Sequence, residues 1–357
     1  MEPGAGRPSA PNPSFLNGGR DHKGRIGKPF LLGGDPAMPT PRKVRDLTPE
    51  DLTSPDLLLR GFDQAGGFSA KGVAQAAEIL ETQWRDREAT NFLSFPADVM
   101  ATGTRGVLVE IVRRGLVDVV ITTGGTLDHD LARAWRPYYE GDWLLDDRAL
   151  ARKHVYRLGN VVIPQANYGG IIESRMRRLL RRLWAKGQRT WTTPELVWAI
   201  GEDLGPERGR GSLARAAFER KVPVFVPGPF DGAVGSQLWL FWQDHRDLRL
   251  DLFADEQGLS DRVFEAKRSH ALILGGGISK HHTIWWNQFR GGLDSAVYVT
   301  TAVEWDGSLS GARLREAVSW GKLKPEARQV TVEGDITVLL PLLAGALFSR
   351  LGTYRRR

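Results

Sequence analysis

The sequence predicts an α/β fold in which a largely parallel sheet is flanked by helices within a single large domain. Short, continuously apolar runs recur along the chain, amphipathic segments lie between them, and glycine-rich polar loops follow them. Strands that are apolar throughout are buried on both faces, which is typical of parallel sheets covered by helices. The runs expected as strands are 117–121, 161–164, 222–226, 271–274, 296–301 and 330–332.

Helices are expected between these runs. A threonine, a proline and two acids at 48–51 mark a helix start. Segment 175–184 is rich in arginine, with apolar residues at helical spacing, which predicts an amphipathic helix with a solvated basic face. A docking surface for an acidic partner or RNA is the alternative interpretation. The other segments expected as helices are 69–88, 103–115, 212–221 and 341–351.

Composition excludes several kinds of site. The 357 residues include no cysteine, which rules out a thiolate nucleophile, disulfides and cysteine-ligated metals. Residues 1–45 hold eight Lys/Arg against three Asp/Glu and are predicted to form a flexible basic arm. Residues 46–357 are the expected catalytic domain, whose body is nearly neutral apart from the arginines at 355–357. We therefore expect no direct nucleic-acid binding, and the absence of a long apolar run predicts a cytoplasmic protein without a membrane span.

The loops after four successive strand runs carry glycines together with Asp, His, Lys or Thr. In open α/β sheets, ligands bind beyond the carboxyl ends of the strands. Glycines 275–277 allow a close approach to a cofactor and suit a pyrophosphate, although glycine turns at strand ends are common and the spacing is not G-x-G-x-x-G. The loops concerned are 122–130, 227–232, 275–282 and 302–308.

Two further groups of residues indicate chemistry. His281 and His282 raise the possibility of a metal site on an extended loop, but no third ligand stands at a recognisable spacing, so acid–base or hydrogen-bonding chemistry is the better interpretation. Glu316, Trp320 and Lys322 suit a cationic amine, because the carboxylate pairs with ammonium and the indole offers cation–π attraction. A neutral lysine amine in that setting can act as a nucleophile, whereas a surface position is the ordinary fate of a lysine.

Taken together, the segments GGGISKHH (275–282), AVYVTTAVEWDGS (296–308) and EAVSWGK (316–322) resemble deoxyhypusine synthase. The resemblance spans roughly residues 60–350 and implies a Rossmann-like fold, assembled as a homotetramer with interfacial active sites. It implies NAD as cofactor, spermidine as substrate, and the precursor of translation initiation factor 5A as the protein partner. The 4-aminobutyl group would pass through an imine on Lys322 to a lysine of that factor.

The resemblance also assigns roles to individual residues. It implies catalytic roles for Lys322 and His281. It places the amine at Gly307, Glu316 and Trp320, with Asp128 and His129 as further substrate-binding candidates. The residues implied to contact NAD are Thr123, Gly124, Asp231, Gly276, Gly277, Thr301, Ala302, Asp306 and Asp335, and segment 97–101 aligns more loosely with another cofactor-binding stretch.

The positions at which this chain departs from the family pattern are expected to lie near the amine substrate rather than near NAD. The eukaryotic pattern has acids where this chain has Ser236, His129 and Leu309, and asparagine where it has Trp285. These changes leave open a homospermidine synthase or another aminobutyltransferase that uses a free amine acceptor. A non-catalytic NAD-binding scaffold is the third hypothesis.

Overall fold

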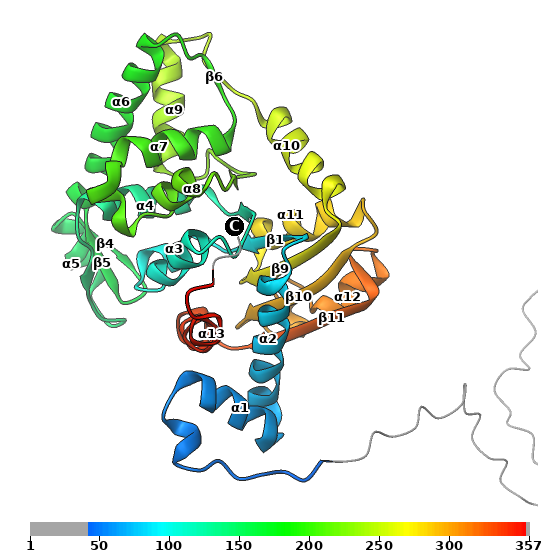
Figure 1. Cartoon of the computed structure of the whole chain (residues 1–357). Helices are drawn as coiled ribbons and strands as arrows, with labels where there is room; N and C mark the ends of the chain where they lie inside the picture. Colours follow the sequence, from blue (N-terminus) through cyan, green and yellow to red (C-terminus); the bar gives the residue numbers. More distant parts are fainter. Residues whose placement is uncertain (1–41, 355–357) are drawn as a thin grey trace, which may run out of the picture. The chain divides into compact units, whose positions relative to one another are not determined.

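A computed structural model describes residues 42–354 of the chain. Its centre is a six-stranded sheet in the order β11-β10-β9-β1-β2-β7, in which all neighbouring strands are parallel (Figure 1). The predicted α/β class and parallel sheet are therefore confirmed. The strands are β1 (Ala89–Ser94), β2 (Val119–Ile121), β7 (Val224–Phe225), β9 (Arg268–Leu274), β10 (Leu293–Thr300) and β11 (Leu323–Glu333).

Side chains alternate across the sheet and build a core on each face. In β9, Leu272 and Leu274 enter one core, whereas Ala271 and Ile273 enter the other. The first core is shared with helices α2, α3 and α13, and the second with α10, α11 and α12. The runs that are buried on both faces, such as 271–274 of β9 and 296–299 of β10, are continuously apolar rather than alternating.

Helices cover both faces, and α4, α6, α7, α8 and α9 also gather in a helical region at the upper left of Figure 1. The α-helices are α1 (Pro55–Ala65), α2 (Phe68–Arg85), α3 (Arg105–Arg113), α4 (Gly124–Trp135), α5 (Asp147–Arg152), α6 (Gly169–Ala185), α7 (Thr193–Arg208), α8 (Leu213–Arg220), α9 (Ala233–Asp244), α10 (Leu252–Glu265), α11 (Gly277–Gln288), α12 (Leu314–Ser319) and α13 (Ile336–Leu351). Short 3₁₀ helices are η1 (Glu50–Leu52), η2 (Ala97–Ala101), η3 (Gln165–Asn167), η4 (Gly209–Gly211) and η5 (Glu304–Asp306).

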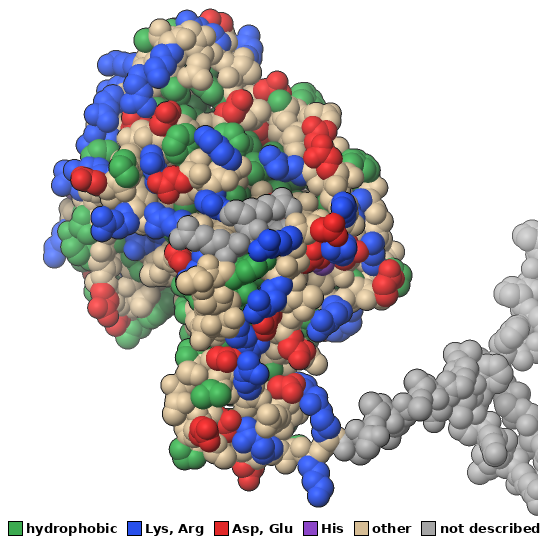
Figure 2. All heavy atoms as spheres, viewed as in Figure 1, with side chains coloured by type: hydrophobic (Ala, Val, Ile, Leu, Met, Phe, Trp, Pro, Cys, Tyr) green, Lys and Arg blue, Asp and Glu red, His purple; other side chains and the backbone are tan. Residues whose placement is uncertain are grey.

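The basic segment 175–184 lies within α6, as predicted. Met176, Leu179, Leu180 and Leu183 are buried on one side of this helix. The opposite side is lined with arginines that form a basic band over α6 at the upper left of Figure 2.

Three sequence-based expectations need correction. Segment 161–164 forms a strand, β5, but it pairs antiparallel in a separate sheet with β3 (Tyr139–Glu140) and β4 (Val155–Leu158). The last helix begins at Ile336 rather than Pro341, because Asp335 caps it by accepting a hydrogen bond from the backbone N–H of Thr337. The helix start predicted at 48–51 forms only the short 3₁₀ helix η1, and the first α-helix begins at Pro55 after the Ser54 cap.

A further small sheet pairs β6 (Thr190–Trp191) with β8 (Arg249–Leu250).

Residues 44–354 belong to one compact unit. The expected arm at 1–45 lies almost entirely outside the described residues, so its predicted flexibility stays a prediction. Within residues 42–354, no helix is both long and apolar enough to cross a membrane.

Candidate active site

The carboxyl ends of the central strands enclose a cavity of about 360 Å³. β1 leads along the sheet to β2 and β7, whereas β9 leads the other way to β10 and β11, so the strand order reverses between β1 and β9. Such a reversal opens a crevice where doubly wound folds bind their ligands. The lining residues are Pro96, Asp98, Val99, Thr102, Gly275, Gly276, Thr300, Thr301, Ala302, Ser310, Asp335, Ile336 and Thr337.

The glycines after β9 shape one wall of this cavity. Gly275 and Gly277 have φ of +65° and +71°, a backbone conformation that other residues adopt only with strain. A Cβ at Gly276 would overlap the Cα of Ser310. α11 then begins without a side-chain cap, so its first N–H groups are available to a phosphate. This geometry fits the pyrophosphate of a dinucleotide.

The loops after β2 and β7 carry three of the residues that were predicted to contact NAD. Thr123 precedes α4, which begins at Gly124, again without a side-chain cap. A Cβ at Gly124 would lie 2.5 Å from the carbonyl oxygen of Asp231, so the two loops pack directly against each other. Thr123, Gly124 and Asp231 are thus brought together, although none of them lines the cavity between β1 and β9.

The loop between β10 and α12 is held to the sheet by buried polar side chains. Tyr298 Oη donates to the carbonyl oxygen of Ser310 at 2.5 Å, and Lys280 Nζ donates to those of Leu309 at 2.9 Å and Ala312 at 2.5 Å. Arg313, which is also buried, donates to the carbonyl oxygen of Ala302 at 3.1 Å. These bonds fix the loop that carries four of the predicted site residues: Thr301, Ala302, Asp306 and Gly307.

Asp306 and Gly307 occupy the exposed turn of this loop. Asp306 Oδ1 accepts a hydrogen bond from the backbone N–H of Ser308 at 2.7 Å, and hydrogen bonding from Ser308 lowers the pKa of the Asp306 carboxyl. Gly307 ends η5 with φ of +69°. An exposed, ionised carboxylate at this turn suits a polar or cationic group of a ligand.

Lys322 lies in the short turn between α12 and β11, directly before the strand, and is 9% exposed. Its Nζ is 5.2 Å from the ring centroid of Trp320 and 5.9 Å from that of Trp285. Within the described part of the chain, this nitrogen has no hydrogen-bond or ion-pair partner. A lysine amine between two aromatic rings and free of competing bonds is suitably placed for nucleophilic chemistry.

His281 lies on α11, on the same face as Trp285 four residues later. The two rings stack with centroids 5.6 Å apart. Burial, together with the neighbouring charge of Lys322, lowers the pKa of His281, so the imidazole is neutral at pH 7 and able to accept a proton. The prediction that His281 and His282 lie on an extended loop is wrong, because both residues lie in α11. No group of three metal-binding side chains occurs in residues 42–354.

Asp128 and His129 lie in α4, away from solvent. Asp128 is fully buried, and its carboxylate accepts hydrogen bonds from Tyr168 Oη and from the N–H groups of Ala233 and Val234, all at 2.7 Å. These contacts cap α9 and favour a structural role over the direct amine contact that we expected. His129 hydrogen-bonds Tyr138 Oη at 3.0 Å, and burial lowers its pKa to about 4.

The remaining predicted residues are exposed. Glu316 is in the first turn of α12, six residues before Lys322. Asp335 lines the cavity and uses Oδ1 to cap α13. Sequence reasoning missed the buried anchors Lys280 and Arg313, whose contacts with the loop appear only in three dimensions, whereas segment 97–101 was noted and contributes Asp98 and Val99 to the cavity.

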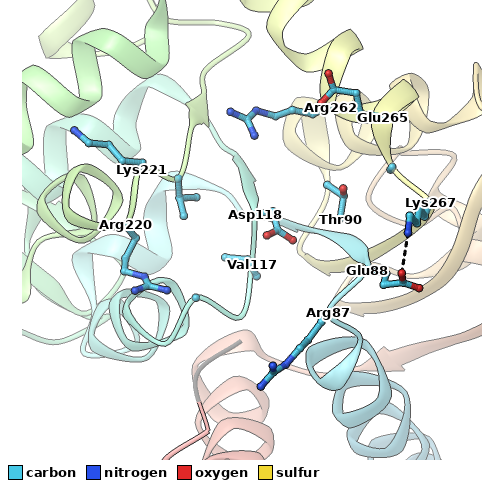
Figure 3. A pocket seen from close by; sticks show the side chains of 13 residues that line it. Arg87, Glu88, Thr90, Val117, Asp118, Arg220, Lys221, Arg262, Glu265 and Lys267 are labelled. Carbon is cyan, nitrogen blue, oxygen red and sulfur yellow. Dashed lines mark hydrogen bonds and ion pairs between the residues drawn. The ribbon is translucent and has the colours of Figure 1, made fainter. Parts of the chain in front are cut away.

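A larger cavity of about 540 Å³ lies at the opposite edge of the sheet, near the amino ends of β1, β2 and β9. Figure 3 shows Arg220 and Lys221 on one side of it, and Arg262, Glu265 and Lys267 on the other. Lys267 pairs with Glu88 at 2.8 Å. None of the predicted site residues lines this cavity, so the candidate active site is the one at the carboxyl ends.

Comparison with known proteins gives a consistent result. A family model described as deoxyhypusine synthase matches residues 57–347. Proteins named probable deoxyhypusine synthase from Picrophilus torridus and Thermoplasma acidophilum are 49% and 50% identical, over 84% and 85% of this chain and 95% and 96% of their own lengths. A crystal structure from Entamoeba histolytica, of a protein assigned to the deoxyhypusine synthases, aligns with a TM-score of 0.59 and 17% identity over 88% of this chain and all of that one; at this identity it supports the fold alone.

Proposed function

The chain belongs to the deoxyhypusine synthase family, and from this we propose that it transfers the 4-aminobutyl group of spermidine to a lysine of the precursor of translation initiation factor 5A, with NAD as cofactor. The observation that carries the proposal is the position of the Lys322 amine, which lies near two tryptophan rings and has no competing bond to any residue of 42–354. The names of the relatives favour a protein acceptor over the free amine used by a homospermidine synthase.

The cavity between β1 and β9 suits NAD. Gly276 and the uncapped start of α11 would hold the pyrophosphate, and Thr301, Ala302 and Asp335 line the same cavity. We propose that Thr123, Gly124, Asp231, Gly277 and Asp306 complete the cofactor site. Bound NAD would supply the hydride chemistry, in which the hydride removed from the amine would be returned to the final imine.

Lys322 carries the aminobutyl group. Its neutral amine adds to the imine carbon of oxidised spermidine, and the bond from that carbon to the departing nitrogen breaks, which releases 1,3-diaminopropane and leaves a butylimine on Lys322. The acceptor lysine then adds to the same carbon, and Lys322 leaves as the free amine. Neutral His281, beside Lys322, accepts and returns the protons that these additions and eliminations move.

We propose that Glu316, Trp320 and Gly307 contact the amine. Glu316 offers a carboxylate to an ammonium group, and the exposed face of Trp320 offers cation–π attraction. Ile278 and Phe289, at the two ends of α11, also expose apolar surface, which supports a homotetramer whose subunits meet at the active sites. Light scattering would measure the oligomeric state.

The test is incubation with NAD, spermidine and purified factor, with diaminopropane release and factor mass measured together. We expect release and a mass increase on one factor lysine. Lys322→Arg should abolish both while leaving NAD binding intact, because a guanidinium does not form the imine. Lys186→Arg, at the exposed end of α6, is the matched control and should behave as wild type. Undiminished transfer by Lys322→Arg would refute the mechanism, and release without a mass increase would favour the small-amine acceptor.

A further inference from the structure

The nitrogen of Lys322 has a second aromatic neighbour, Trp285, at a position where the eukaryotic family pattern has asparagine. Trp285 belongs to α11, more than 30 residues before Lys322 in sequence, yet its ring centroid lies 5.9 Å from Lys322 Nζ. Trp320 approaches the same nitrogen from the other element, at 5.2 Å. Both distances are within the range at which a ring face attracts a cation.

Trp285 is held in place by aromatic contacts on its own helix. The His281 ring stacks on it with an interplanar angle of 27°, and Phe289 meets it edge-on with centroids 5.8 Å apart. His281, Trp285 and Phe289 are spaced four residues apart, so they form one continuous stripe along α11. Preorganised rings lose little conformational entropy when a ligand binds between them.

The rings nevertheless remain open to a ligand. Trp285 is 42% exposed and Trp320 is 66% exposed, whereas Lys322 between them is 9% exposed. Two partly exposed indoles that flank a buried amine can enclose a small cation next to that amine.

We infer that Trp285 and Trp320 form an aromatic clamp that recognises the cationic aliphatic amine beside Lys322, with Trp285 as a specificity-determining residue. This inference rests on the proposed function and extends it, because part of the recognition of the amine is assigned to ring faces rather than to carboxylates alone.

The test measures amine binding without turnover. Calorimetry with NADH present, which prevents oxidation of the amine, would give Kd for spermidine, for 1,4-diaminobutane and for 4-aminobutan-1-ol, which carries one charge fewer. We expect Trp285→Leu to weaken spermidine binding by about 5- to 30-fold and Trp285→Phe by no more than about 3-fold, because phenylalanine keeps a ring face. Trp143→Leu, at an exposed tryptophan outside the site, is the matched control and should leave Kd unchanged.

The dependence of Kd on the charge of the ligand distinguishes cation–π attraction from other contacts of the Trp285 ring. If the ring recognises a cation, Trp285→Leu should weaken the diamine more than the amino alcohol. Equal weakening of the two ligands, or equal losses in Trp285→Phe and Trp285→Leu, would overturn the clamp. So would a change of oligomeric mass in Trp285→Leu, which would assign the ring to a subunit contact. Transfer of the aminobutyl group by the wild-type protein is measured separately. The proposed function stands if the wild-type protein modifies the factor, even if the Kd for spermidine is the same in the Trp285 variants.

Discussion

Lys280 Nζ donates a hydrogen bond to the carbonyl oxygen of Ala312 at 2.5 Å, so a lysine of α11 holds the loop that leads into α12. Lys280 is 1% exposed, and burial lowers its pKa to about 8. A lowered pKa alone would make Lys280 a rival nucleophile. Its enclosure and its bonds to two carbonyl groups instead make it an anchor, which leaves Lys322 as the amine that a substrate can reach.

Lys280→Met tests this distinction. The substitution leaves the carbonyl groups of Leu309 and Ala312 without their donor, and we expect a loss of about 2 kcal/mol in the free energy of unfolding, measured in urea. Borohydride trapping with NAD and spermidine should still place the adduct on Lys322. Loss of the adduct from a folded Lys280→Met protein, or an adduct on Lys280 in the wild type, would reverse the roles of the two lysines.

Gly276→Ala should damage cofactor binding. The new Cβ would overlap the Cα of Ser310, so the wall of the cavity must shift. We expect NAD affinity, measured by calorimetry, to fall at least about tenfold, because backbone displacement at a dinucleotide site disturbs several N–H contacts at once.

Gly106→Ala is the matched control for that change. Gly106 lies in α3 with nothing within 4 Å of an added Cβ, so alanine should leave NAD binding intact and stabilise the helix slightly. Equal NAD affinities for Gly276→Ala and Gly106→Ala would place the pyrophosphate elsewhere.

Sequence patterns predicted five strands of the central sheet but missed β1. Its sequence, ATNFLS, contains Thr90, Asn91 and Ser94 and so lacks a continuous apolar run. Asn91 is buried because its side-chain amide donates to the carbonyl oxygens of Gln83 and Leu116, partners that the local sequence does not identify. The glycine turns and Lys322 were predictable because their local sequences are distinctive. Trp285 was noted as a departure that could compensate in amine binding, but its proximity to Lys322 was not predictable, because it depends on how α11 packs against the segment after α12.

His129 should make the fold sensitive to acid. An unfolded histidine takes up a proton near pH 6.5, whereas burial lowers the pKa of folded His129 to about 4. Between these values the unfolded state binds more protons, so stability falls as the pH falls from about 6.5 to about 4. The contribution of this residue is at most about 3 kcal/mol.

Urea unfolding at several pH values would measure the effect. His129→Gln should flatten the dependence between pH 6.5 and 4, while His154→Asn, at an exposed histidine, should leave it unchanged. If the free energy of unfolding of His129→Gln depended on pH as steeply as that of the wild type, other groups would cause the acid sensitivity.

Asp128→Asn distinguishes a structural role of Asp128 from the direct contact with the amine that the sequence predicted. A direct amine ligand, once neutralised, raises KM for spermidine and leaves stability largely intact. The structure instead has Asp128 accept two hydrogen bonds from the start of α9 and one from Tyr168 Oη, so Asp128→Asn should lower the free energy of unfolding by about 1–3 kcal/mol. Tyr168→Phe removes one of these three donors and should cost about 1 kcal/mol. Because α9 follows the loop that contains Asp231, we also expect weaker NAD binding in Asp128→Asn. A stable Asp128→Asn protein whose KM for spermidine alone is raised would restore the amine contact that the sequence predicted.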